Sequence, residues 1–315
     1  CSHGGKNGFD GTNCPYCNEP AVAQTALKKG EYDRLWRNFA NLQDALDADR
    51  DGGAEFKLLA DVTGDYTIDG TQDTGLDLNG HSIKGTVTVK AATGNNTTTF
   101  SNTQNTTTAS IDAVVAHRGA KLAGSKYPAV IGTLTLAGGA TWKNILNDTA
   151  LGYKVLNADG THKWYARDDV KGSQLNNVII NRLPITSKTL NLKVDGKNLT
   201  GNSPKVERGT TVQLCASCNA KDVTVEFSIL KKGETTPITL TKPSYADRKY
   251  TKDYSFDTIG EYTIYFTATK DGYSVTSSHK QLTVTKAAIP ASAITAPAAN
   301  ALTYNGNCLL YTSPS

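Results

Sequence analysis

The first seventeen residues, CSHGGKNGFDGTNCPYC, hold the residue types best suited to binding a metal ion. Cys1, His3, Cys14 and Cys17 supply three thiolates and one imidazole, a ligand set that tetrahedral Zn²⁺ prefers. The C-x2-C spacing of the last two cysteines allows both sulfur atoms to reach one ion. Because the segment is too short and polar to form its own core, a metal would supply folding free energy. We therefore predict a Cys/His knuckle over residues 1–30 with a structural Zn²⁺; a disulfide clamp or a frayed terminus is the alternative.

A second cysteine pair, Cys215 and Cys218, lies in the sequence CASC where a strand is expected to turn into a loop. The spacing fits a short disulfide, a pair of free thiols, or half of a metal site. A redox-active pair would need a helix beginning after the first cysteine, and the residues that follow do not form a helical pattern. We therefore do not expect redox catalysis here.

Large aromatic residues gather near the middle of the chain. Trp164 and Tyr165 belong to the segment Gly152–Val170, and Trp142 precedes it. Exposed flat rings can stack on the apolar faces of sugars, which would make these three residues a glycan-binding platform. The favoured interpretation is that they fill the end of a hydrophobic core, because large aromatic side chains usually contribute core area.

Acidic residues are the remaining candidates for chemistry. A polysaccharide-cleaving enzyme on a solenoid would need paired carboxylates, or carboxylates around Ca²⁺ with a nearby base. Glycines interrupt the spacing that would put the aspartates on one helical face, so we expect them to scatter and predict no enzymatic activity. The residues that could form such a site are Asp65, Asp69, Asp73, Asp77, His81 and Arg118.

The elements that must position these residues are short strands with glycine and asparagine corners. Leu76–Leu78 and Thr86–Val89 alternate apolar and polar residues on either side of the turn Asn79-Gly80. Similar units follow at Ser110–Ala123 and Ala129–Leu136, while Gly94–Ser110 is expected to be a loop. Strands too short to bury a core singly indicate the stacked turns of a β-solenoid, which we predict to be right-handed.

Two further regions complete the predicted architecture. Glu31–Ala48 has apolar residues at helical spacing and is predicted to be a helix that caps a solenoid over residues 31–185. Residues 186–286 alternate strand and turn patterns, as in an Ig-like β-sandwich, and Asp257–Tyr262 resembles a tyrosine corner. Residues 287–307 are predicted to be a linker and the start of another repeat. Residues 308–315 resemble a translated sequencing adapter, so we interpret the chain as a metagenomic fragment.

Composition favours an all-β extracellular protein. The 315 residues are rich in Thr, Asn, Gly and Ser, and the net charge is only +4. Basic residues do not cluster among aromatics, so nucleic acid is not an expected partner. An uninterrupted apolar run of about 18 residues, which a membrane-spanning helix needs, is missing from the sequence.

Several stretches resemble large cell-surface proteins of gut Firmicutes. The unit FKLLADVTGDYTI followed by LDLNGHSIKGTVTV, and the later GYKVLNADGTHKWYARDDV, carry the likeness. It extends over residues 1–185 and continues more loosely into the Ig-like part. Some members are attached to the cell wall and bind host molecules, immunoglobulin among them.

The resemblance implies a non-catalytic segment of an extracellular, cell-wall-attached surface protein. Its expected role is adhesion, or the binding of host glycans, glycoproteins or immunoglobulin. The alternatives are a polysaccharide-active enzyme or its accessory module on the solenoid, and a pure structural spacer.

Overall fold

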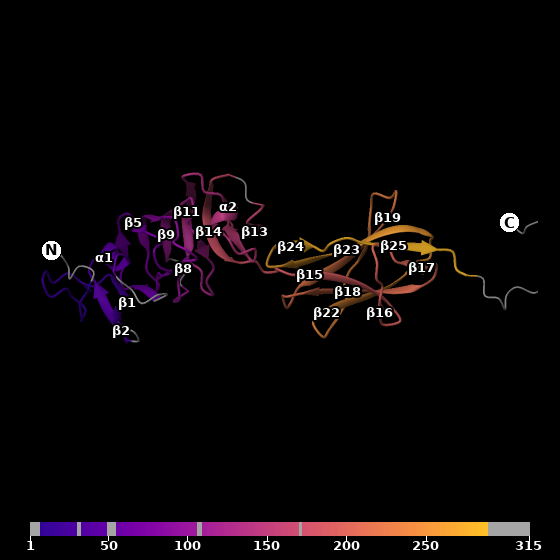
Figure 1. Ribbon diagram of the computed structural model, residues 1–315, viewed down its shortest axis with the longest axis horizontal. Coiled ribbons are helices and arrows are strands. Elements are labelled where there is room, and N and C mark those ends of the chain that lie inside the picture. The colour runs from indigo at the N-terminus through magenta and orange to yellow at the C-terminus, as the bar shows by residue number, and fades with distance from the viewer. Residues whose placement is uncertain (1–6, 30–32, 49–54, 106–108, 170–171, 289–315) are drawn as a thin grey trace, which may run out of the picture. The chain divides into compact units, whose positions relative to one another are not determined.

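The computed structural model describes residues 7–29, 33–48, 55–105, 109–169 and 172–288. Nearly all of the regular structure in these residues is β-strand, as predicted (Figure 1). The chain divides into two compact units. One consists of Cys1–Thr189, Ser217–Val225 and Thr267–Thr276, and the other of the remaining residues. We call strands β1–β14 the solenoid and strands β15–β25 the sandwich, and describe each by itself.

The centre of the solenoid is a β-solenoid of about four turns, or rungs, which confirms the predicted repeat architecture. Each rung contributes strands to two sheets, and equivalent strands of successive rungs pair in parallel. The strands of the first sheet are β3 (Glu55–Leu58), β6 (Thr74–Asp77), β8 (Thr98–Ser101) and β10 (Leu122–Ala123). Those of the second are β4 (Val62–Thr63), β5 (Tyr66–Ile68), β7 (Ile83–Val89), β9 (Ser110–His117) and β11 (Val130–Ala137).

Columns of stacked apolar side chains form the core between the two sheets. In one column, Val87 pairs with Val114, which pairs with Leu134 of the next rung. In the other sheet Leu76 lies in register between Phe56 and Phe100. These side chains are all buried. A single rung has too few apolar residues to form a core, so each depends on its neighbours.

The corners of the rungs require unusual backbone angles. Asn79 and Gly80 have φ angles of 48° and 89°, which confirms the predicted turn. The flanking strands belong to different sheets, however, so this turn is a corner of the solenoid rather than a hairpin. Gly70 lies so close to the next rung that a Cβ atom there would collide with the backbone carbonyl of Ala91.

The prediction of a helix over Glu31–Ala48 was wrong. Asp33–Phe39 is strand β2, which pairs antiparallel with β1 (Ala23–Lys29), and only Leu42–Leu46 forms a helix, α1. Trp36 is 44% exposed, so the helically spaced residues do not share one buried face. Pairing with β1 over seven residues overrides the local helical pattern. The predicted boundary at residue 30 also falls inside this hairpin, which extends the first sheet beside β3.

Antiparallel strands close the other end of the solenoid. Helix α2 (Trp142–Ile145) follows the last rung, and β14 (Gln174–Arg182) pairs with β11. The strands β12 (Leu151–Leu156) and β13 (His162–Ala166) continue the same sheet outward. The parallel stacking therefore stops at β11.

The sandwich consists of two sheets. In one sheet the strand order is β16-β15-β18-β22-β21, and in the other it is β17-β25-β23-β19-β20, with β24 beside β23. The first contains β15 (Lys188–Val194), β16 (Lys197–Asn198), β18 (Thr211–Cys218), β21 (Ser244–Ala246) and β22 (Lys249–Ser255). The second contains β17 (Lys205–Glu207), β19 (Thr224–Lys231), β20 (Ile238–Leu240), β23 (Gly260–Lys270), β24 (Tyr273–Thr276) and β25 (Lys280–Thr285).

Alternating residues of the sandwich strands face a buried core. Leu214 of one sheet and Phe227 and Phe266 of the other are fully buried. The two phenylalanine rings meet edge to face with centroids 6.1 Å apart. The hydroxyl of Tyr262 donates a hydrogen bond to the backbone carbonyl of Thr258 at 2.7 Å. This is the bond that the sequence predicted at this corner.

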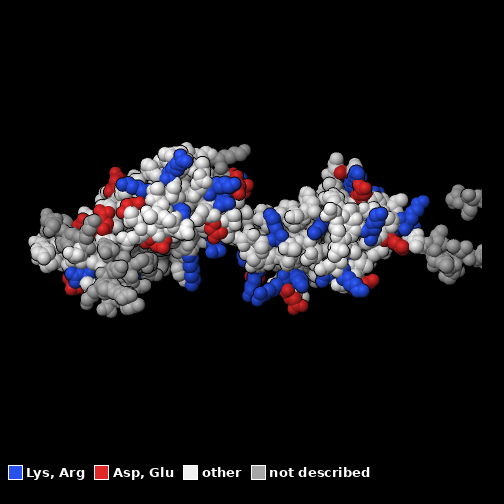
Figure 2. Space-filling view, in the orientation of Figure 1, with Lys and Arg blue, Asp and Glu red and all other residues white. Residues whose placement is uncertain are grey.

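Charged side chains of both signs are interspersed over the face of the molecule shown in Figure 2. Among the described residues, neither helix has the length and apolar character needed to cross a bilayer.

Candidate functional site

The aspartates of the solenoid link one rung to the next. Their Oδ1 atoms accept hydrogen bonds from backbone N–H groups 21 to 26 residues further along the chain, at N···O distances of 2.7 to 2.9 Å. This separation is one rung of the solenoid. The pairs are Asp61 with Ser82, Asp65 with Thr86, Asp73 with Thr97, and Asp77 with Thr103. The sequence pattern pointed to scattered carboxylates but did not suggest this role.

Asp77 is the most buried of these carboxylates, at 4% exposure. Its Oδ1 accepts hydrogen bonds from the N–H groups of Asn79 and Thr103, both at 2.9 Å. Its Oδ2 accepts a third from the Thr103 hydroxyl at 2.6 Å. Three donors satisfy the buried charge, so this carboxylate serves as a structural acceptor.

The remaining candidates for catalysis bind different partners. Asp69 accepts hydrogen bonds from the N–H and hydroxyl of Thr71 within its own turn. His81 Nδ1 lies 3.6 Å from Asp61 Oδ1, and Arg118 is exposed. Asp69 and His81 therefore each interact with a different partner.

The aromatic residues predicted to bind glycans lie mainly inside the protein. Trp142 is 4% exposed and Trp164 is 8% exposed, so neither presents a ring face to solvent. The Trp142 ring packs edge to face on Tyr153 with centroids 4.6 Å apart, and its Nε1 donates to the Gly172 carbonyl at 2.6 Å. Tyr165 is half-buried, with Lys163 Nζ 5.0 Å from its ring centroid. Trp142 belongs to the hydrophobic core of the solenoid, whereas Trp164 and Tyr165 are not part of that core cluster.

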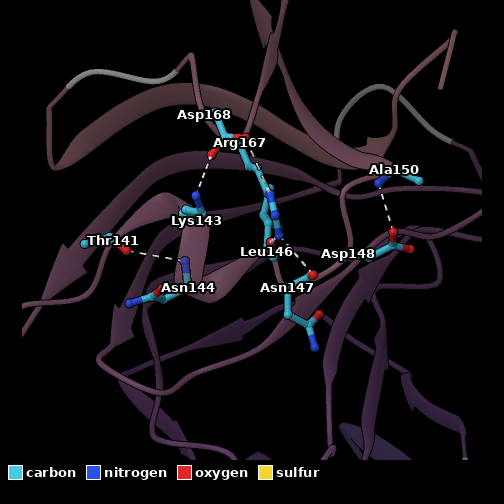
Figure 3. A network of polar contacts seen from close by, with 9 residues as sticks. All are labelled: Thr141, Lys143, Asn144, Leu146, Asn147, Asp148, Ala150, Arg167 and Asp168. Atoms are coloured by element: carbon cyan, nitrogen blue, oxygen red, sulfur yellow. Dashed lines mark hydrogen bonds and ion pairs between the residues drawn. The ribbon is translucent and has the colours of Figure 1, made fainter. Parts of the chain in front are cut away.

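Arg167, which the sequence analysis did not single out, closes the C-terminal end of α2 (Figure 3). Its Nη1 donates to the carbonyls of Leu146 and Asn147 at 3.0 and 2.9 Å. At the other end of the helix, the Thr141 hydroxyl accepts a hydrogen bond from the Asn144 N–H. A guanidinium at a helix C-terminus satisfies carbonyls that lack helical partners and opposes their partial negative charge.

A hollow of about 380 Å³ lies beside this helix. Its charged groups already have partners, because Lys143 Nζ lies 3.6 Å from Asp168 Oδ1 and Arg167 Nε lies 3.9 Å from Asp168 Oδ2 (Figure 3). Two cationic residues, Lys143 and Arg167, therefore share the one carboxylate of the lining. It is lined by Leu136, Ala140, Thr141, Trp142, Lys143, Arg167, Asp168, Gly172 and Ser173.

Cys14 and Cys17 lie in a tight hairpin over residues 12–21. The N–H of Asn18 bonds to the Cys14 carbonyl at 2.8 Å, and the N–H of Cys14 bonds to the Glu19 carbonyl at 2.8 Å. Asn18 has a φ angle of 58°, a conformation that asparagine tolerates better than most residues. The Cys14 side chain is buried, at 1% exposure, and Cys17 is partly exposed.

The two thiols titrate differently. Burial raises the pKa of Cys14, but hydrogen bonds from the backbone of Tyr16 and Cys17 and from the Cys17 side chain outweigh it, so this pKa is lowered. Burial raises the pKa of Cys17, and the hydrogen bond to Cys14 raises it further, against a backbone hydrogen bond from Glu19. Cys14 is therefore the more readily ionised of the two thiols.

Cys1 and His3, the other predicted zinc ligands, lie outside the described residues. Among the residues that are described, groups of three or more His, Cys, Asp or Glu suited to a metal ion do not occur. The structure thus brings together two of the four predicted ligands.

Cys215 and Cys218 are free thiols three positions apart on β18. Cys215 is buried, with its sulfur 3.4 Å from Gln213 Oε1, and Cys218 interacts with the Ala220 carbonyl. Side chains three apart on a strand point to opposite faces, about 10 Å apart along the strand. A disulfide requires Cα atoms closer than about 7 Å, so this strand geometry favours two separate thiols.

Comparisons with known proteins give little further guidance. Protein-family models and curated proteins do not match the chain. Among solved structures, the soluble domain of PmoD from Methylocystis sp. ATCC 49242 (Rockwell) is similar at 13% identity, with a TM-score of 0.25. The similarity covers 31% of this chain and 90% of that one. An engineered protein, 15% identical with a TM-score of 0.25, is matched over 38% of this chain but only 24% of its own length.

Proposed function

We propose that this chain is a non-catalytic segment of an extracellular surface protein, in which the solenoid is a scaffold for adhesion or host-molecule binding. The main observation in support of the proposal is that the solenoid carboxylates act as structural hydrogen-bond acceptors. Asp61, Asp65, Asp73 and Asp77 accept backbone hydrogen bonds from the neighbouring rung. Groups that an enzyme would use for acid–base chemistry hold the scaffold together instead.

The architecture of the sandwich supports an Ig-like spacer module. In an Ig fold, strands A-B-E-D form one sheet and C-F-G the other. The orders β15-β18-β22-β21 and β19-β23-β25 follow that pattern. The hydrogen bond of Tyr262, near the start of β23, matches the tyrosine corner of such domains. Ig-like modules commonly occur in cell-surface proteins, in agreement with the proposed extracellular location.

A pure structural spacer is the second candidate function. Burial of Trp142 and Trp164 favours it, because these rings are not available to stack on sugars. In this case, binding would belong to other parts of a longer protein.

One binding experiment separates these functions. The purified chain is applied to an array of host glycoproteins, immunoglobulins, mucin glycans and plant glycans. Saturable binding to one class, retained by a Tyr165→Ala variant and lost on thermal unfolding, supports a scaffold with its ligand surface outside the aromatic cluster. Loss of binding in Tyr165→Ala would restore the glycan-platform hypothesis. A blank array with folded protein supports the spacer.

A further inference from the structure

We infer that the hollow beside α2 binds an acidic sugar, that is, a sugar ring that carries one carboxylate. The hollow has a volume of about 380 Å³ and lies next to the end of β11, where the parallel stacking of the solenoid stops. Pockets for small ligands have volumes of about 300–1,000 Å³, so its size suits a small ligand. The inference rests on the proposed function, because it gives a surface and a chemical class to the glycan that such a scaffold would hold.

The lining of the hollow carries a net positive charge. Lys143 and Arg167 contribute two cations, and Asp168 contributes the one carboxylate among the lining residues. Lys143 Nζ lies 3.6 Å from Asp168 Oδ1, and Arg167 Nε lies 3.9 Å from Asp168 Oδ2 (Figure 3). Both distances exceed the length of a hydrogen bond, which is about 2.7–3.2 Å. A second carboxylate would therefore meet an excess of positive charge, and the Lys143 ammonium has donors to bind it.

The two cations are held in different ways. Arg167 is fixed, because its Nη1 donates to the carbonyls of Leu146 and Asn147 and its side chain is only 16% exposed. Its buried Nε has no hydrogen-bond partner among the described residues, so Asp168 leaves this charge incompletely satisfied. The Lys143 side chain is 67% exposed. Because an exposed ion pair contributes little to stability, an incoming carboxylate can replace Asp168 as the partner of Lys143.

The walls of the hollow combine apolar groups with hydroxyls. Leu136 and Trp142 contribute apolar surface, and Thr141 and Ser173 contribute hydroxyls. Two hydrogen bonds hold these walls together, from Trp142 Nε1 to the Gly172 carbonyl at 2.6 Å and from the Leu136 N–H to the Ser173 carbonyl at 2.7 Å. A sugar ring has the complementary composition, with apolar C–H groups and hydroxyls. Trp142 is too buried to stack on a sugar face, so it acts here as part of a wall.

Calorimetric titration of the full chain with matched pairs of sugars tests this inference. The acidic probes are sialyllactose, a host-type sugar, and methyl galacturonoside, a plant-type sugar; lactose and methyl galactoside are their neutral counterparts. We expect an acidic probe to bind at one site per chain, about tenfold or more tightly than its neutral counterpart, because a charged hydrogen bond is lost in the latter. The pair that responds identifies the source. Inorganic sulfate should compete poorly, because it makes no use of the apolar wall.

Three variants locate the binding site. Lys143→Gln removes one cation and should weaken binding of the acidic probe by about tenfold. Asp168→Asn removes the competing carboxylate and should strengthen binding, an effect opposite to that of a general loss of structure. Lys84→Gln is the matched control, because this exposed lysine of β7 lies outside the lining and its replacement changes the net charge equally. It should leave the affinity unchanged.

Three results would each overturn the inference: equal binding of acidic and neutral probes, equal effects of Lys143→Gln and Lys84→Gln, or weaker binding by Asp168→Asn. Sulfate that competes as strongly as the sugars would overturn the assignment of the ligand as a sugar. The proposed function fails separately. Binding of an acidic probe that depends on Lys143, together with a blank host array, would support the hollow and contradict host binding. An array signal that survives Lys143→Gln would support host binding and contradict the hollow.

Discussion

The solenoid and the sandwich are both built from short strands, but different forces define their geometry. In the sandwich, alternating apolar residues of two sheets meet in a core, and a tyrosine hydroxyl holds one corner. In the solenoid, apolar columns run through the rungs, and carboxylates link neighbouring corners. The comparison shows that acidic residues in a repeat fold can act as structural hydrogen-bond acceptors.

Substitutions in the apolar core of either region should have the largest effect on stability. Leu76→Ala in the solenoid and Leu214→Ala in the sandwich should each lower the free energy of unfolding by about 2–5 kcal/mol, because both side chains are fully buried. Chemical denaturation measures the loss of unfolding free energy, and hydrogen exchange locates the strands that are destabilised. The change in Leu76→Ala should reach β3 and β8, since its neighbours in register are Phe56 and Phe100. Leu59→Ala, at a 37% exposed position, is the control and should cost far less.

Removing a structural carboxylate should have the next largest effect. Asp77→Ala leaves the N–H groups of Asn79 and Thr103 without their acceptor, which should cost about 2–4 kcal/mol of stability. Asp77→Asn keeps an acceptor oxygen and should cost only about 1 kcal/mol. Equal losses in the two variants would show that charge, rather than the hydrogen bonds, matters. Asp112→Ala, at an exposed aspartate, should change stability by no more than about 0.5 kcal/mol.

Two tyrosines provide a smaller, matched comparison. Tyr262→Phe in the sandwich removes the hydrogen bond to Thr258 and should cost about 1 kcal/mol. In the solenoid, the buried hydroxyl of Tyr153 has no hydrogen-bond partner among the described residues. Tyr153→Phe should therefore be neutral or slightly stabilising, since it removes an unsatisfied polar atom. Equilibrium unfolding of both variants measures the difference, and a clear loss in Tyr153→Phe would indicate an ordered water or other partner.

The raised pKa of Tyr153 should make the stability of the protein depend on pH in the alkaline range but not at neutral pH. Burial raises the pKa of Tyr153 above the usual value for tyrosine. The folded state therefore retains this proton when the unfolded state loses it, so stability is complete below about pH 10 and falls as the pH rises further. Tyr153→Phe should show a shallower loss than the wild type in alkaline unfolding titrations. Identical slopes would mean that Tyr153 ionises freely in the folded protein.

Local patterns in the sequence predicted corners and strands better than they predicted pairing. Asn79-Gly80 was recognisable because few residue pairs tolerate two positive φ angles. The strand β8 was hidden in a Thr- and Asn-rich run that was expected to be a loop, because its stability comes from pairing with β6. Likewise, β2 was mistaken for a helix because its partner β1 was not recognised.

In the candidate sites, too, the sequence predicted local contacts but not contacts between distant residues. Cys14 and Cys17 were predictable as neighbours because their contact is local in sequence. The pairing of Asp77 with Thr103 spans 26 residues and depends on the register of the rungs. The C-terminal cap of α2 by Arg167 likewise depends on contacts 20 and 21 residues away. Sequence spacing alone does not predict such distant contacts.

The most direct test of a non-catalytic scaffold is the release of new reducing ends or unsaturated products from a panel of polysaccharides, measured with Ca²⁺ and Zn²⁺ present. The wild-type chain should release no more product than a heat-denatured sample. Turnover by the wild type that disappears in a folded Asp77→Asn or Asp73→Asn variant would contradict it. That result would make the solenoid carboxylates catalytic rather than structural.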